Sequence, residues 1–156
     1  MIPEELKQYI GKQYAPHVRE VEKGAIRRYA EAIDDDNPIY CDEEYATKSS
    51  YGTIIAPPGF FGWAKKRADV APKAIIEVWE ATMKAGYGRL LDGGISYEFN
   101  LPVREGDTLV ASMKVKDIYE REGKSGTKMI FPVFETTYIN QNGDIVAKAC
   151  HTMISR

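Results

Sequence analysis

The sequence predicts a single α+β domain, residues 1–156, in which an antiparallel β-sheet wraps around a long buried central helix. Two features of the sequence favour this fold. The run at residues 59–64 is apolar on every side, as expected for a helix enclosed by protein. From residue 95 onward, apolar and polar residues alternate with a period of two, in stretches separated by turn signals. A chain of 156 residues is long enough to bury one substantial core.

The first periodic segment covers residues 25–33. Its apolar residues recur at i, i+3, i+4 and i+7, which predicts an amphipathic helix; they are Ile26, Tyr29, Ala30 and Ile33. The segment runs directly into Asp34, Asp35 and Asp36. Carboxylates at the C-terminus of a helix oppose the helix dipole. The acidic segment is therefore either a solvated loop or a place where function overrides local stability.

A turn and a second, short helix are expected next. Asn37 precedes Pro38, and a residue before proline is held in an extended conformation, so the chain changes direction here. Asp42 has the character of an N-cap for a helix over residues 43–48, whose first turn is acidic.

The central helix is assigned to residues 59–64. Pro57 and Pro58 suit the start of a helix. The basic run at residues 65–67 has the charge that the C-terminal end of a helix favours. Residues 70–88 are ambiguous, because helical spacing is followed by Gly86 and Gly88. This stretch is interpreted as an excursion that lines a ligand pocket or caps the core.

The second half of the chain predicts four sequential antiparallel strands. They cover residues 95–101, 108–118, 127–140 and 144–155. Between the last two, Asn142-Gly143 is a strong signal for a type I′ hairpin turn.

Composition excludes several classes of protein. Hydrophobic residues make up 44% of the chain and charged residues 28%, with a formal net charge of −2. This charge gives no electrostatic basis for binding nucleic acid or an anionic membrane. No signal peptide and no membrane span is expected. Cys41 and Cys150 show neither metal-ligand spacing nor a disulfide framework, so a cytoplasmic protein without a metal site is expected.

Three blocks of the sequence resemble MaoC-like hydratases and dehydratases, which have the hot-dog fold. Residues 35–40, Asp-Asp-Asn-Pro-Ile-Tyr, resemble the family motif D-x-N-P-[I/L]-H. Residues 54–59 resemble the start of the family's central helix, and residues 94–107 resemble one of its strands and the following turn. The resemblance extends from about residue 21 to residue 154 and is closest to the FAS1-like, or MaoC dehydratase N-terminal, type.

The resemblance implies reversible hydration of a 2-enoyl thioester to an (R)-3-hydroxyacyl thioester. The thioester, on coenzyme A or acyl carrier protein, is the substrate, and no cofactor is implied. Asp35 takes the catalytic aspartate position, Asn37 the asparagine position and Tyr40 the histidine position. In such a site aspartate and histidine hold one water between them and act as base and acid.

The resemblance also implies a thioester-binding segment. Pro58, Gly59, Phe60 and Trp63 are the expected substrate-binding residues. The thioester oxygen gains negative charge during the reaction, and backbone N–H groups at a helix N-terminus stabilise such charge. Because proline has no N–H group, the donors are expected from Gly59 or Phe60.

Tyrosine is a poor replacement for histidine. Its reference pKa is about 10, against about 6.5 for histidine, so Tyr40 is a weak base at neutral pH. The two histidines of the chain do not supply an obvious substitute. His17 is expected in a surface loop, and His151 on the inner face of a strand.

The missing histidine favours a subunit that binds the acyl thioester while a partner hot-dog subunit supplies the catalytic pair. The alternatives are a homodimeric hydratase using Asp35 and Tyr40, a hot-dog acyl-CoA thioesterase, and a non-catalytic acyl-CoA-binding or assembly module. In each case fold-level analogy predicts a homo- or heterodimer acting in fatty acid metabolism.

Overall fold

The computed structural model describes residues 2–66, 72–123 and 126–156. The helices are α1 (Glu4–Lys7), α2 (Lys23–Ala32), the 3₁₀-helix η1 (Pro38–Tyr40), α3 (Glu43–Lys48) and α4 (Lys73–Lys84). The strands are β1 (His17–Glu20), β2 (Trp63–Ala64), β3 (Leu90–Phe99), β4 (Thr108–Glu122), β5 (Lys128–Ile139) and β6 (Ile145–Ser155). They form one antiparallel sheet in the order β2-β1-β4-β5-β6-β3, which confirms the predicted α+β class.

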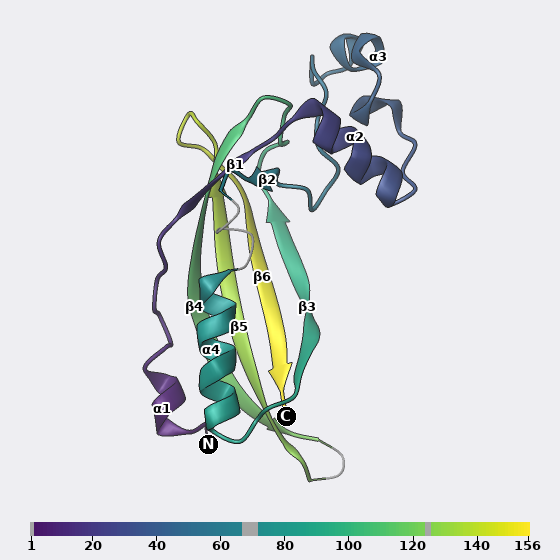
Figure 1. Ribbon diagram of the computed structural model, residues 1–156. Helices are drawn as coiled ribbons and strands as arrows, with labels where there is room; N and C mark the ends of the chain where they lie inside the picture. The colour runs from purple at the N-terminus through teal and green to yellow at the C-terminus, as the bar shows by residue number, and fades with distance from the viewer. Residues whose placement is uncertain (1, 67–71, 124–125) are drawn as a thin grey trace.

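The helices divide between the two ends of the molecule (Figure 1). Helix α4 lies along one face of the sheet and contacts β4, β5 and β6. Helices α2 and α3 gather beyond one end of the sheet, whereas both chain termini lie at the opposite end. The acidic segment after α2 therefore lies well away from α4, the helix on the face of the sheet.

Helix α4 is the central helix. Its buried residues, Ala74, Val78 and Thr82, follow each other at intervals of four and form one face toward the sheet. Ile76 and Met83 on the other side are exposed. The enfolded helix is thus amphipathic, and burial on all sides was the wrong expectation.

The helix predicted at residues 59–64 does not exist. The N–H of Phe60 donates to the carbonyl of Pro57 (3.0 Å) and Gly59 has φ 90°, which describes a β-turn with Pro58 and Gly59 at its centre. Gly62 also has a positive φ, 70°, which a right-handed helix cannot contain. The apolar run is buried because two turns press it against the core.

The interpretation of residues 70–88 as an excursion was wrong where the structure describes it, because α4 occupies most of that stretch. The expected role as a cap of the core agrees with the packing of α4 on the sheet. Gly86, interpreted as a break in the pattern, is instead the helix terminator. It has φ 93° and its N–H donates to Met83 (3.0 Å), while the N–H of Tyr87 donates to Thr82 (2.9 Å). This is a Schellman motif, which glycine favours. Residues 67–71, including Arg67 of the basic run, lie outside the described residues.

The four predicted strands are confirmed, with β3 starting at residue 90 rather than 95. The hairpin at Asn142-Gly143 is also confirmed, but its turn is not type I′. That turn needs positive φ at both central residues, and only Gly143 has it (88°). The side chain of Asn140 accepts N–H groups of Asn142 and Asp144 (both 3.0 Å), which stabilises a wider loop with a register shift.

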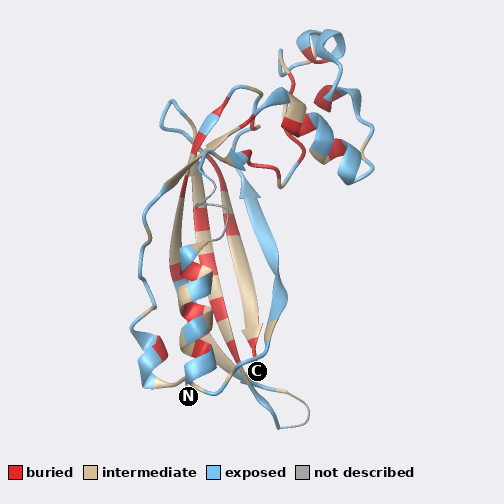
Figure 2. Cartoon of the chain, in the orientation of Figure 1, coloured by how far each residue is buried: buried red, intermediate tan, exposed pale blue. Residues whose placement is uncertain are grey.

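The core consists of two clusters (Figure 2). One lies between α4 and the sheet and includes Phe134. The other joins α2, η1 and the segment at residues 54–61 to the end of the sheet. Across the described residues, no helix combines the length and apolar character that spanning a bilayer requires.

Candidate functional site

The C-terminus of α2 places the acidic segment. The N–H of Asp34 donates to Glu31 (3.2 Å) and the N–H of Asp35 to Ala30 (3.0 Å), a second Schellman motif. Its left-handed position is held by Asp34, with φ 58°, the only non-glycine residue of the described chain with positive φ. Glycine or asparagine is preferred at such a position, so the backbone is strained immediately before the predicted catalytic aspartate.

Asp35 and Asn37 shape the following turn. One carboxylate oxygen of Asp35 accepts the N–H of Asn37 (3.2 Å). The side-chain oxygen of Asn37 accepts the N–H of Ile39 (3.1 Å) and caps η1. The extended geometry predicted for Asn37 is confirmed by its ψ of 121°. These two side chains therefore direct Tyr40, the last residue of η1, into the core.

Tyr40 is buried, with 8% of its surface exposed. Burial, the charge of Asp35 and the neighbouring Tyr51 raise the pKa of Tyr40 above its usual value. Its phenol is therefore protonated at neutral pH, where it donates a hydrogen bond but cannot act as a base. Within the described residues its hydroxyl forms no hydrogen bond.

A cavity of about 420 Å³ lies beside Tyr40. Its walls are Tyr40, Tyr51 and two segments, residues 55–61 and 99–103. The second segment carries Phe99 at the end of β3, and the first carries the turn that replaces the predicted helix. A cavity with apolar walls and a few polar groups is the usual form of a small-molecule site.

The predicted substrate-binding residues divide between the cavity and the surface. Pro58, Gly59 and Phe60 line the cavity. Trp63 does not: it lies in β2, is 57% exposed and packs edge-on against Phe60 with ring centroids 5.7 Å apart. Asp35 is half-buried beside Tyr40 without lining the cavity.

The two N–H groups expected to bind the thioester oxygen differ in their hydrogen bonding. The N–H of Phe60 already donates within the turn, whereas the N–H of Gly59 has no acceptor among the described residues. No helix begins at Gly59, so this N–H acts without the helix dipole that the sequence suggested.

An aromatic cluster borders the cavity and was not expected to be part of the site. Phe61 stacks on Tyr138 with ring centroids 4.1 Å apart, and it also contacts Tyr97 and Phe99. Tyr97 and Phe99 lie in β3, at alternate positions. Both are exposed, Phe99 by 51%, because the described chain supplies nothing to cover β3.

Strand β3 is at the end of the sheet and exposes apolar side chains. Ile95, Tyr97 and Phe99 share one face, opposite His151, Ala149 and Ala147 of β6. No other strand of the described residues pairs with its outer edge. An unpaired apolar edge strand is a surface for pairing with another chain.

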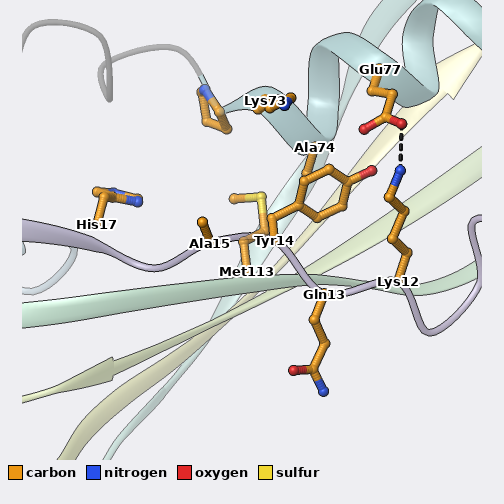
Figure 3. Close-up of a pocket in the computed structure, with 10 residues that line it drawn as sticks. Lys12, Gln13, Tyr14, Ala15, His17, Lys73, Ala74, Glu77 and Met113 are labelled. Atoms are coloured by element: carbon orange, nitrogen blue, oxygen red, sulfur yellow. Dashed lines mark hydrogen bonds and ion pairs between the residues drawn. The ribbon is translucent and has the colours of Figure 1, made fainter.

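A second cavity, of about 460 Å³, lies between the N-terminal segment and the start of α4 (Figure 3). Lys12 forms an ion pair with Glu77 of α4 and lies over the ring of Tyr14. Burial raises the pKa of Tyr14. None of the predicted site residues lines this cavity, and its most prominent charges already neutralise each other.

Neither histidine completes the site. His17, expected in a loop, lies in β1. His151 lies on the inner face of β6, as expected, with its Nε2 3.1 Å from Asp92. Among the described residues, no group of three His, Cys, Asp or Glu side chains is placed to hold a metal ion.

Comparison with known proteins identifies the family. Residues 8–149 match the family described as "FAS1-like, dehydratase domain region". A UPF0336 protein of Saccharopolyspora erythraea is 30% identical over 149 residues, which cover 95% of this chain and 89% of the relative.

Solved structures agree on the fold. The ChsH1–ChsH2 complex from Mycobacterium tuberculosis contains a chain that superposes with a TM-score of 0.82 at 20% identity, covering 97% of this chain and 93% of that one. A chain of the HadBC (3R)-hydroxyacyl-ACP dehydratase complex from the same organism gives 0.66 at 21% identity, covering 94% and 96%. The chain therefore belongs to the FAS1-like dehydratase family of MaoC-like hot-dog proteins.

Proposed function

We propose that this chain is the thioester-binding subunit of an (R)-specific 2-enoyl thioester hydratase, and that a partner hot-dog subunit supplies the catalytic aspartate and histidine. The observation that carries the proposal is the state of Tyr40. The turn through Asp35 and Asn37 is intact and a cavity lies beside it, yet the histidine position holds a buried, protonated phenol.

The hydration reaction needs a second proton-transferring group that this chain does not supply beside Asp35. Hydration breaks one O–H bond of water, places the hydroxyl on Cβ of the enoyl group and delivers a proton to Cα. A base near neutrality must take the water's proton in the transition state. Asp35 supplies a carboxylate, but a phenol with a raised pKa cannot exchange protons with it at neutral pH.

The unpaired edge of β3 supports the partner. A second hot-dog sheet adding its own edge strand would cover Ile95, Tyr97 and Phe99. Among the structural relatives, ChsH1–ChsH2 and HadBC were solved as two-protein complexes.

Co-expression tests the proposal. The chain is produced alone and together with a MaoC-like subunit that carries D-x-N-P-x-H, and the loss of enoyl absorbance of crotonyl-CoA is followed. Negligible turnover by the chain alone and turnover by the complex are expected. Replacing the motif histidine of the partner by alanine should abolish the activity, whereas robust turnover by the purified chain alone would contradict the proposal.

A homodimeric hydratase that uses Asp35 as the base and the protonated Tyr40 as a hydrogen-bond donor is the second candidate, because the two side chains lie close enough for the charge of Asp35 to raise the pKa of Tyr40. In that case Tyr40→Phe abolishes turnover by the chain alone. Under the first proposal the same substitution leaves the activity of the complex within about twofold of the wild type.

A further inference from the structure

The turn at residues 57–60 brings Gly59 close to two tyrosine side chains. A Cβ atom built on Gly59 would lie 3.5 Å from the hydroxyl oxygen of Tyr29 and 3.9 Å from the ring of Tyr97. Gly59 also lines the cavity beside Tyr40. Two phenols from distant parts of the chain, α2 and β3, therefore flank one glycine at the margin of the candidate site.

The position of Tyr29 is well fixed. Its ring packs against Phe60, with ring centroids 4.9 Å apart, and belongs to the helix face that carries the buried residues Ile26 and Ala30. A side chain held by a helix and an aromatic neighbour loses little further freedom when it binds a ligand.

Neither the hydroxyl of Tyr29 nor the N–H of Gly59 forms a hydrogen bond with any described residue. Burial raises the pKa of Tyr97, whose phenol stays protonated and adds no negative charge. Together, the Tyr29 hydroxyl and the Gly59 N–H provide two neutral hydrogen-bond donors. Such donors suit an oxygen that carries partial negative charge.

We infer that Tyr29 is a substrate-binding residue whose hydroxyl, with the N–H of Gly59, donates hydrogen bonds to the carbonyl oxygen of the bound acyl thioester. This inference rests on the proposed function and names the groups that recognise its substrate. Charge on the thioester oxygen increases when water adds at Cβ, so the same donors also stabilise the transition state.

Matched ligands with and without that oxygen test the inference. Butyryl-CoA and S-butyl-CoA differ only in the carbonyl oxygen, and octanoyl-CoA and S-octyl-CoA form a longer pair. Binding of each ligand to the chain, purified with any partner that accompanies it, is measured by isothermal titration calorimetry. Tyr29→Phe keeps the ring and removes the hydroxyl. Tyr45→Phe, on the exposed face of α3, is the control for loss of a remote phenol.

Tyr29→Phe should weaken binding of each thioester by about fivefold, the size of one neutral hydrogen bond, and leave thioether binding unchanged. Tyr45→Phe should change neither. If the variant folds poorly, the wild type decides, because it should bind each thioester at least about fivefold more tightly than its thioether. Equal losses for thioester and thioether, or no loss, overturn the inference and leave the proposed function standing. A wild type that binds no thioester overturns both.

Discussion

The strained backbone at Asp34 gives a stability prediction that depends on one dihedral angle. Asp34 adopts φ 58° at the left-handed position of the Schellman motif that ends α2. A non-glycine residue in this region costs roughly 1 kcal/mol, with aspartate at the low end of the range. Removing a carboxylate from a helix C-terminus adds about 0.3 kcal/mol, and the greater freedom of glycine in the unfolded chain takes away about 0.5 kcal/mol.

Asp34→Gly should therefore stabilise the protein by about 0.8 kcal/mol, or roughly 2 °C in Tm for a domain of this size. The matched control is Asp36→Gly, which removes the same side chain from the same acidic segment at a residue without positive φ. It should be neutral or slightly destabilising. Chemical denaturation of both variants beside the wild type measures the difference. Equal effects of the two substitutions would show that the dihedral angle stores no strain.

Three further predictions concern an ion-pair network, a close backbone approach and the cap of η1. Glu135 lies between Lys114 (2.8 Å) and Lys116 (2.9 Å), which lower its pKa to about 2. Because the pKa of Glu135 is lower in the folded state, its ion pairs stabilise the fold above pH 4.5, and this contribution is lost as the pH falls toward 2. In urea melts, Glu135→Gln should therefore reduce the fall in the free energy of unfolding over this pH range. Gly62→Ala places a Cβ 2.5 Å from a backbone oxygen of β1 at φ 70°, and thermal melts should show a loss of more than about 2 kcal/mol. Asn37→Ala removes the cap of η1 and should lower the free energy of unfolding by about 1 kcal/mol, with unchanged stability contradicting a capping role.

The sequence predicted those helices and strands that are specified by residues close together in the chain. Helix α2 shows a regular apolar period, and Asp42 caps α3 by accepting the N–H of Tyr45 (3.0 Å) as expected. The four long strands follow from their alternation. These features depend on residues close together in the chain, so a single sequence contains them.

The central helix was misplaced because burial and helicity give the same apolar signal. Residues 59–64 are apolar because they fill the core between two glycine turns, and composition does not reveal the positive φ of Gly59 and Gly62. Helix α4 has mixed polarity because only one face meets the sheet.

The candidate site could be predicted only in part. The motif located Asp35, Asn37 and Tyr40, and their local contacts are those of a turn. Tyr29 and Tyr97 meet at Gly59 only through tertiary packing, so no spacing in the sequence indicated them.

The outer edge of β3 has a consequence for production of the protein in a cell. An exposed edge strand with apolar side chains is a template for unplanned pairing, which competes with correct assembly at high concentration. Resistance to aggregation then becomes a property of the assembly rather than of the chain. Synthesis in excess of whatever covers this edge should leave the surplus chain insoluble, so its usable abundance would be set by stoichiometry.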